Sequence, residues 1–350
     1  MSQAFSNWVT WREIHSQPDI WRNWGAELDV AGLRSWIARQ SFDEVWFSGA
    51  GTSAYIGDII AASIKGTRSV PSTDIVAEPS HILAGARPLV VSFGRSGNSA
   101  ESIGTMEALD ALAPDAPRLN ITCNKAGALA TRRSSAPLQV IVLPEATHDA
   151  GFAMTSSFST MLLTALALFD APCKVSDRLN ALAGQLDDLL SGFVAGARPE
   201  RAVYVGSGPL AFAAREAALK VMELTAGQTP ALWDSTLGFR HGPKSFVTEM
   251  TAITLFLNAH SPTHDYDTDL AAELRRQFPR SAVQTIGPGG DFEVAMPFGP
   301  AWAAPLCVAA AQICGVTWAD ALGLNVDDPF SGRATLSRVV SDVKLYPVTP

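Results

Sequence analysis

From Glu44 onward, short apolar runs alternate with longer amphipathic stretches, and this alternation limits the folds that the chain can adopt. The runs lack the polar alternation of a strand that has one face in water, and several end in turns rich in Gly or Ser. Such strands are typical of a parallel sheet that helices cover on both faces. We therefore expect an α/β fold built from doubly wound, flavodoxin-like parallel sheets.

The runs form two series, and a Gly-, Pro- and Arg-rich stretch at 191–201 separates them. The expected strands are 45–48, 72–76, 89–93, 118–122 and 138–143 in the first series, and 202–206, 251–257 and 282–286 in the second. The expected helices, after a helical and Trp-rich start, are 53–64, 100–112, 155–168, 210–226, 267–277 and 302–322.

The first strand of each series ends in a Gly-x-Gly turn that opens a helix, at 49–51 and at 206–208. Two such turns at a domain-sized offset indicate a duplication, and 350 residues suffice for two domains. The predicted parts are an N-terminal helical arm at 1–40 for packing or dimer contact, a first domain at 41–192, a second at 197–340 and a tail at 341–350.

Composition excludes several classes of protein. A net charge of −8 and a pI near 5.3 argue against a nucleic-acid partner. The four cysteines form no CxxC pair, and the first residues show no secretion signal. Because the longest apolar runs, such as 160–169, are too short to cross a bilayer, no membrane association is expected. The expectation is a cytoplasmic protein in the reduced state.

The turn at 49–53 places Gly51, Thr52 and Ser53 where a strand gives way to a helix. A helix N-terminus preceded by glycine offers backbone N–H groups to an anion, and the two hydroxyls add donors. The turn lacks the third glycine of a dinucleotide fingerprint and the Gly-Lys-Ser/Thr of a P-loop. The alternative is a tight turn with an ordinary helix cap.

A second loop, at 92–99, strengthens the case for a phosphate. It contains two glycines, three hydroxyls, an Arg and an Asn in eight residues, which is more than capping requires. Asn98 stands where a nucleophile elbow needs glycine, so Ser96 is interpreted as a hydrogen-bond donor and not as a nucleophile. The candidate residues of this loop are Gly94, Arg95, Ser96, Asn98 and Ser99.

A third hydroxyl cluster opens the helix expected at 155–168 with Thr155 and Ser156. Its alternative role is again a helix cap. Three hydroxyl-rich turns between strand and helix in one domain together indicate a small phosphate site made of neutral donors. The six histidines show no metal-ligand spacing, so neither a metal nor another cofactor is expected.

Acid–base residues gather in the second series. Glu216, Lys220 and Glu223 share one face of an otherwise apolar helix, and the alternative is an exposed ion pair of little consequence. His241 follows in a Gly- and Pro-framed turn, expected between a helix and a strand, and its near-neutral pKa suits proton relay.

These residues resemble the sugar isomerase (SIS) domain family, and most closely its galactosamine-6-phosphate deaminase/isomerase members, also called tagatose-6-phosphate ketose/aldose isomerases. The resemblance covers nearly the whole chain from about residue 40 and implies two tandem SIS domains. The matching segments are 11–18 (WREIHSQP), 49–58 (GAGTSAYIGD), 92–99 (SFGRSGNS), 151–157 (GFAMTSS) and 238–245 (GFRHGPKS).

The resemblance also implies roles for single residues. Glu223 matches the base that moves a proton between C1 and C2, Lys220 a lysine near the reacting oxygens, and His241 a histidine for ring opening that reaches the site from a partner subunit. A homodimer with shared active sites is therefore expected. The residues that match the phosphate site are Thr52, Ser53, Ser96, Ser99 and Thr155, with Arg95 where glutamine-fed synthases often have Gln.

The chain departs from the synthases near its end. Arg338 is the best counterpart of a C-terminal lysine that forms an imine there, and a guanidinium cannot form one, so charge stabilisation is the role left to it. No glutaminase segment or N-terminal cysteine nucleophile is present in the sequence, so amination fed by glutamine is not expected.

The expected function is conversion of a hexosamine 6-phosphate, galactosamine 6-phosphate in preference, to a ketose 6-phosphate and ammonia. Three alternatives stay open at this point: a glucosamine-6-phosphate deaminase, a simple aldose–ketose isomerase of sugar phosphates, and a non-catalytic sugar-phosphate sensor.

Overall fold

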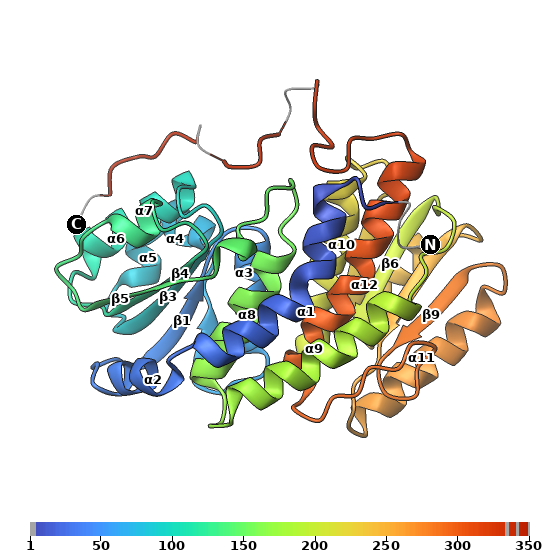
Figure 1. The fold of residues 1–350 in the computed structure, drawn as a ribbon, viewed down its shortest axis with the longest axis horizontal. Coiled ribbons are helices and arrows are strands. Elements are labelled where there is room, and N and C mark those ends of the chain that lie inside the picture. The colour runs from blue at the N-terminus through green and yellow to red at the C-terminus, as the bar shows by residue number, and fades with distance from the viewer. Residues whose placement is uncertain (1–4, 333–335, 341–342, 349–350) are drawn as a thin grey trace. The chain divides into compact units, whose positions relative to one another are not determined.

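The structure is a computed structural model, and it describes residues 5–332, 336–340 and 343–348. Two parallel sheets form its framework, one of five strands and one of four, which confirms the predicted α/β fold (Figure 1). The strands of the first sheet are β1 (Glu44–Ser48), β2 (Thr67–Ser69), β3 (Pro88–Gly94), β4 (Arg118–Thr122) and β5 (Leu138–Val142), and those of the second are β6 (Arg201–Gly206), β7 (Ala231–Ser235), β8 (Thr251–Phe256) and β9 (Ala282–Ile286).

Contacts between residues divide the chain into two units, one around each sheet. The five-stranded unit takes 26–148, 156–175 and the chain from 337, and the four-stranded unit takes the chain up to 25, 149–155 and 176–336. Most of α9 (Val175–Gly192) therefore groups with the second sheet, whereas the sequence assigned residues up to 192 to the first domain. The predicted boundaries of the two repeats stay a prediction.

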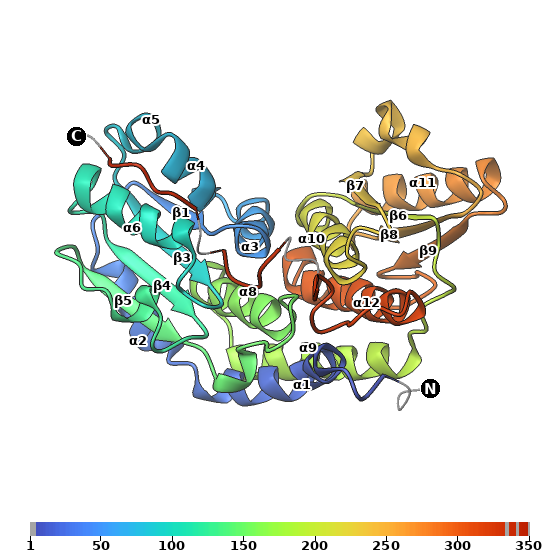
Figure 2. The same cartoon turned by 90° about the horizontal axis from the view of Figure 1, so that it is seen from above.

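In the five-stranded unit the order of strands is β2-β1-β3-β4-β5, all parallel. Helices α4, α5 and α6 pack together on one face, and α2 and α8 lie on the other (Figure 2). The buried side chains of β1, Val45 to Phe47, show why an unbroken apolar run forms a central strand. The helices are α2 (Val30–Ala38), α3 (Thr52–Ala61), α4 (Ser72–Ala77), α5 (Pro79–Leu83), α6 (Ala100–Leu112), α7 (Ala128–Thr131), η1 (Glu145–Thr147) and α8 (Ser156–Phe169).

In the four-stranded unit the order is β7-β6-β8-β9, again all parallel. Helix α10 packs closely on α12, and the absence of a side chain at Gly315 of α12 makes this possible. A Cβ at Gly315 would lie 2.6 Å from Leu224 Cδ1 of α10. Leu270 and Leu274 of α11 join the buried cluster formed by β6 and β8. The helices are α1 (Val9–Glu27), α9, α10 (Pro209–Leu224), η2 (Gly238–His241), η3 (Pro243–Phe246), α11 (Thr263–Gln277) and α12 (Pro300–Ala321).

One predicted strand is wrong. Residues 72–76 belong to α4, which starts after Pro71 and has Asp74 in its first turn. The strand that pairs with the outer side of β1 is β2, at 67–69. Proline just before a helix and an acidic residue in its first turn are start signals that the apolar Ile75 and Val76 obscured. At three partly exposed residues, β2 is too short to be recognised from an apolar run.

Strand β7 was missed for a related reason. All five of its residues are only partly buried, and β7 is the edge strand of its sheet. Its sequence, Ala-Leu-Trp-Asp-Ser, therefore has no continuous apolar run. As a consequence the turn with His241 lies between two strands, β7 and β8, and not between a helix and a strand as predicted.

The longest apolar segment is α12, a helix of 22 residues, and it is longer than the apolar runs expected from the sequence. Helix α12 is long and apolar enough to cross a membrane by length and composition. However, 94% of its most apolar window is buried inside the protein, against α10 and neighbouring helices. Its composition therefore reflects its place as a core helix of the four-stranded unit.

Candidate active site

The first sheet has a topological switch point, where the chain leaves the central strands in opposite directions. Strand β1 pairs with β2 on one side and with β3 on the other. In this order, 2-1-3-4-5, ligands bind beyond the carboxyl ends of the first and third strands. The turn at 49–53 and the loop at 94–99 follow those two strands, so the fold brings the two predicted phosphate loops to one edge of the sheet.

The turn after β1 requires both of its glycines. Gly51 has φ +56°, where other residues are strained, and it precedes the first residue of α3. A Cβ at Gly49 would lie 2.5 Å from Ser53 Cβ, so the helix can approach the strand only because no side chain is present. Thr52 and Ser53 are buried at the start of α3, with their backbone N–H groups at the positive end of the helix.

The loop after β3 combines caps with further donors. Ser99 caps α6, and its Oγ accepts from the Ser102 backbone N–H at 3.2 Å. The Ser96 hydroxyl accepts from the Asn98 backbone N–H at 3.2 Å, and the side-chain amide oxygen Oδ1 of Asn98 accepts from the Ala128 N–H at 2.8 Å. The Ser99 hydroxyl also lies 2.9 Å from that of Ser102, and either of the two can be the donor. The Ser96 hydroxyl and the Asn98 amide accept in these contacts and keep their own hydrogens to donate. A role of this loop beyond capping the helix stays a prediction.

Arg95 lies buried in the same loop, and its guanidinium donates to the backbone carbonyl of Arg338 at 3.0 Å. The backbone N–H of Ala100, at the start of α6, donates to the carbonyl of Val340 at 3.1 Å. The C-terminal segment thus passes over the loop within the five-stranded unit. The side chain of Arg338 is exposed, and it is the backbone of this residue that meets the loop.

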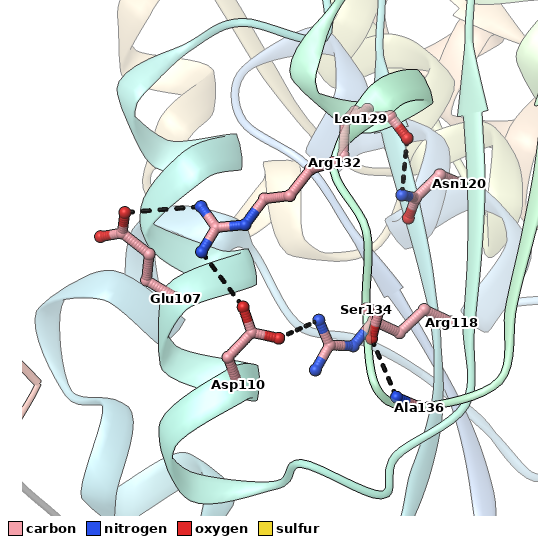
Figure 3. Close-up of polar contacts among 8 residues, drawn as sticks. All are labelled: Glu107, Asp110, Arg118, Asn120, Leu129, Arg132, Ser134 and Ala136. Atoms are coloured by element: carbon pink, nitrogen blue, oxygen red, sulfur yellow. Dashed lines mark hydrogen bonds and ion pairs between the residues drawn. The ribbon is translucent and has the colours of Figure 1, made fainter.

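An ion-pair network fixes α6 behind the loop (Figure 3). Asp110 of α6 pairs with Arg118 of β4 at 2.6 Å and with Arg132 at 3.1 Å. Asn120 of β4 donates to the carbonyl of Leu129 at 2.8 Å. Arg118 is almost fully buried, whereas the side chains of Asp110 and Arg132 stay about one third exposed, and the network links α6 to β4 of the sheet.

The third predicted cluster is fully buried. The Thr155 hydroxyl donates to Asp149 at 2.8 Å and its N–H donates to the same carboxylate at 2.9 Å. By contact grouping Thr155 belongs to the four-stranded unit and Ser156 to the five-stranded unit. In this structure the hydroxyl hydrogen of Thr155 therefore points to a carboxylate, while its role toward a phosphate stays a prediction.

The second sheet repeats the backbone geometry of the first at its own switch point. Gly208 has φ +57° and ψ −128°, against +56° and −129° at Gly51. A Cβ at Gly206 would lie 2.6 Å from the backbone of Leu210, as one at Gly49 would meet Ser53. The side chains differ, because Pro209 and Leu210 stand where the first turn has Thr and Ser. Proline also removes a backbone N–H.

A buried carboxylate occupies the second switch point. Asp267 of α11 accepts from the Ser207 hydroxyl at 2.7 Å and from the Thr236 hydroxyl at 2.5 Å. Its other oxygen accepts from the Asn258 N–H at 2.9 Å, and the residue is fully buried. The Ser207 hydroxyl of this turn thus donates to an internal carboxylate, and the negative charge of that carboxylate opposes a second anion at the same place.

The predicted acid–base face of α10 is an interior one. Lys220 is fully buried, with its Nζ 3.3 Å from Glu216 Oε1 and 2.5 Å from Glu223 Oε2. Glu216 is buried as well, whereas the Glu223 side chain stays a quarter exposed. The alternative of a solvent-exposed ion pair is therefore wrong.

Charge on Lys220 is secured by its neighbours. Burial alone would lower the pKa of Lys220, but the Glu216 and Glu223 carboxylates outweigh it and raise the pKa above its ordinary value. Lys220 therefore carries an ammonium, which can donate to a developing oxyanion and is unsuited to forming an imine. Glu223 is the member of the three that solvent, and hence a substrate, can reach.

His241 ends η2 and is exposed. Gly242, with φ +131°, and Pro243 shape the chain after it, and buried Phe239 anchors the chain before it. Glu273 of α11 ties the turn down by accepting from Arg240 at 2.8 Å and from Lys244 at 2.5 Å. Lys244 and Arg240 also hold the pKa of Glu273 below its ordinary value. The histidine thus projects from a fixed turn.

Sequence reasoning missed several residues that the structure makes prominent. Asp267 lies in an acidic stretch whose other members are exposed or partly exposed, so no local signal distinguishes it. Glu13, Asp149 and Asp327 come from three distant segments that meet only in the fold. In residues 5–332, 336–340 and 343–348, no group of three or more His, Cys, Asp or Glu could hold a metal ion.

Comparison with known proteins gives the family. No family model matches the chain. The chain is 38% identical to D-galactosamine-6-phosphate deaminase AgaS of Escherichia coli, over 97% of this chain and 96% of the relative. It is 36% identical to D-galactosamine-6-phosphate deaminase AgaS of Shewanella sp. (strain ANA-3), over 99% of this chain and 94% of the relative.

Solved structures agree. Tagatose-6-phosphate ketose/aldose isomerase from Escherichia coli superimposes with a TM-score of 0.86 and 35% identity, over 97% of this chain and 96% of that chain. Glucosamine-6-phosphate deaminase from Thermotoga maritima shares the fold, with a TM-score of 0.76 and 23% identity over 95% of this chain and 99% of that chain. Identity across nearly the full length of both chains shows that this protein belongs to the AgaS family of D-galactosamine-6-phosphate deaminases.

Proposed function

We propose that this protein is a sugar-phosphate deaminase/isomerase that converts D-galactosamine 6-phosphate to a ketose 6-phosphate and ammonia. Membership of the AgaS family supports the proposal. The observation that carries it is the Lys220–Glu223 pair, because it places a solvent-accessible carboxylate 2.5 Å from a buried ammonium. Such a pair suits proton abstraction next to a carbon that bears a developing oxyanion.

The five-stranded unit supplies the donors for the phosphate in this proposal. Hydroxyls and helix N-termini at one switch point, together with a buried guanidinium, form the kind of site that binds a phosphate dianion. The proposed residues of this unit are Gly51, Thr52, Ser53, Gly94, Arg95, Ser96, Asn98, Ser99 and Ser156. Thr155, which precedes α8 and groups with the four-stranded unit, is proposed as a further phosphate donor.

The chemistry falls to residues of the four-stranded unit. His241 assists opening of the sugar ring, which gives a C1 aldehyde with the amine on C2. Glu223 removes the proton from C2, giving an enolamine, and returns it to C1, while Lys220 stabilises charge on the C1 oxygen. The resulting ketimine at C2 takes up one water, the C–N bond breaks, and ammonia leaves. The products are one ketose 6-phosphate and one ammonia.

Several wider features belong to the same proposal. The active unit is a homodimer in which His241 acts in the partner's site, and the exposure of His241 favours that role. The two sheets arose by duplication, and the nearly identical turns at Gly51 and Gly208 support this. The enzyme acts in the cytoplasm as a hydrolase of a carbon–nitrogen bond, without metal, cofactor, nucleic acid or membrane, and Arg338 adds positive charge near the phosphate loops.

Ammonia release tests the proposal. We expect the purified protein to release ammonia from galactosamine 6-phosphate faster than from glucosamine 6-phosphate or their N-acetyl forms. Glu223→Gln should lower kcat by about a thousandfold while binding of the sugar phosphate persists, since a positioned base contributes about 10²–10⁴-fold. Glu200→Gln, an exposed glutamate of the same unit, serves as the control. No ammonia from any of the four sugars, or full activity in Glu223→Gln, would contradict the assignment.

A further inference from the structure

In the four-stranded unit, three carboxylates from three segments form hydrogen bonds at or next to residues 149–155. Glu13 of α1 accepts from the backbone N–H groups of Ala150, at 2.5 Å, and Gly151, at 3.3 Å. Asp149 accepts from the N–H and the hydroxyl of Thr155, at 2.9 and 2.8 Å. We call Glu13, Asp149 and Asp327 the acidic clamp.

Asp327 joins the other two segments of the acidic clamp. Its carboxylate accepts from the N–H groups of Val9 and Thr10 and from the Thr10 hydroxyl, each at 2.8 Å. Its backbone carbonyl accepts from the N–H of Phe152 at 3.0 Å. Carboxylates thus join the start of α1 both to residues 149–155 and to the chain after α12, and a backbone hydrogen bond joins the latter two segments to each other. Hydrogen bonds to an ionised carboxylate are stronger than those between neutral groups.

Packing against α1 is equally close. A Cβ at Gly151 would lie 2.4 Å from Thr10 Oγ1 and 3.0 Å from Glu13 Oε2, so only glycine fits between them. The ring of Phe152 lies 5.1 Å from that of Phe330. Residues 149–155 are therefore packed against α1 through Gly151 and against the chain after α12 through Phe152.

The surroundings of Glu13 bring its pKa close to neutral pH. Burial, and then the Asp149 charge, raise its pKa, while the N–H groups of Ala150 and Gly151 lower it and Asp327 raises it, giving a pKa of about 7. The titratable groups that face Glu13 are Asp149, in the segment 149–155, and Asp327, in the chain after α12. Glu13 binds a proton more tightly when residues 149–155 are seated than when Glu13 is surrounded by water, because its pKa is higher in the seated state. Ionisation of Glu13 therefore favours opening of the segment.

We propose that Glu13 is a positioning residue that seats residues 149–155, and with them Thr155 and the neighbouring Ser156, for the sugar-phosphate reaction. The inference rests on the proposed function, since both hydroxyls are assigned there to the phosphate. It gives the Trp-Arg-Glu-Ile-His-Ser-Gln-Pro segment at 11–18 a role: Glu13 holds a hydroxyl-bearing segment that lies more than a hundred residues away.

Hydrogen exchange of the Ala150 and Gly151 amides tests the seating without any use of activity. Glu13→Ala should speed their exchange by about tenfold or more, because it removes the side chain that accepts from both N–H groups. Glu13→Gln keeps an acceptor oxygen and should stay within about threefold of wild type at pH 6. Relative to Glu13→Gln at the same pH, wild type should exchange faster at pH 8 than at pH 6. Glu27→Gln, at the exposed end of α1, is the control.

Steady-state kinetics on galactosamine 6-phosphate test the link to the reaction. Glu13→Ala should raise KM by about tenfold with kcat changed by less than about threefold, and Glu13→Gln should rescue KM. Unchanged exchange in Glu13→Ala, or altered exchange with unchanged KM, would overturn the inference. If wild type turns over none of the sugar phosphates, the proposed function fails instead, and the exchange experiment still decides whether Glu13 seats the segment.

Discussion

The two parallel sheets of this protein have the same strand order around their switch points and nearly the same turn after the first strand, yet opposite chemistry at that turn. At Gly51 and Gly208 the backbone angles agree within about one degree. The turn of the first sheet leads into Thr52 and Ser53, and that of the second into Pro209 and Leu210. The two turns therefore share a backbone geometry and differ in the donors that follow it, because Pro209 has no N–H and Leu210 has no hydroxyl.

Asp267 completes the contrast. In the five-stranded unit the loop beside the turn contains a buried guanidinium, Arg95, whereas in the four-stranded unit a buried carboxylate takes the donated hydrogen bonds. The second unit also has buried charges on the inward face of α10, where Lys220 pairs with Glu216 and Glu223. The difference supports the proposed division of labour, in which the first unit holds the phosphate and the second moves protons.

The largest expected effect concerns the α10 charges. Lys220→Met leaves Glu216 buried without its cation, and breaking a buried pair in this way costs about 3–5 kcal/mol of unfolding free energy. Denaturant unfolding measures it, with exposed Lys65→Met as the control. The double variant Glu216→Gln/Lys220→Met should recover part of the loss; no recovery would show that Lys220 stabilises the unit by packing alone.

The next effect concerns the internal anion. Asp267→Asn cannot accept all three hydrogen bonds at once, so we expect a loss of about 2 kcal/mol in unfolding free energy. Affinity for the sugar phosphate, measured by calorimetry, should stay within about twofold of wild type. A large fall in affinity would mean that the second switch point takes part in binding, against the comparison made above.

Exchanging residues between the two turns sharpens the comparison. Ser53→Leu, which imports the residue of the second turn, should weaken sugar-phosphate binding about tenfold, because it removes a donor to a charged ligand. The reverse change, Leu210→Ser, should create no second site, since the Asp267 charge remains. Calorimetric titration of both variants checks this, and equal losses in the two would contradict it.

The smallest effect is one of pH. The pKa of Glu13 is raised from 4.5 to about 7, so the folded state binds the extra proton and its stability falls as pH rises from about 4.5 to about 7. Wild type should lose stability relative to Glu13→Gln by about 1 kcal/mol or less across this window, given that Glu13 is partly exposed. Thermal unfolding at pH 5, 6, 7 and 8 measures the difference. A constant difference would place the titration elsewhere.

The sequence predicts features that neighbouring residues determine. Apolar runs mark β3 and β6, because a strand buried on both faces needs them along nearly its whole length. Gly and Ser density marks the two phosphate loops. Half-buried edge strands such as β2 and β7 leave no such run.

Contacts made only in the folded chain leave even less trace. Asp267 resembles the acidic residues beside it until α11 packs against the second sheet, and then it alone is fully buried. Glu13 meets its partners across more than a hundred residues, and no spacing along the chain encodes that. The Glu223–Lys220 pair was found from helical spacing, but its burial depends on α12, whose Gly315 admits α10 so closely.

One titration tests the division of labour most directly. In the Glu223→Gln background, which prevents turnover, galactosamine 6-phosphate should bind with one equivalent per chain. Ser53→Leu in that background should weaken binding about tenfold, and Ser207→Ala at the second turn should leave it unchanged. Two equivalents per chain, or a loss caused by Ser207→Ala and not by Ser53→Leu, would contradict the account.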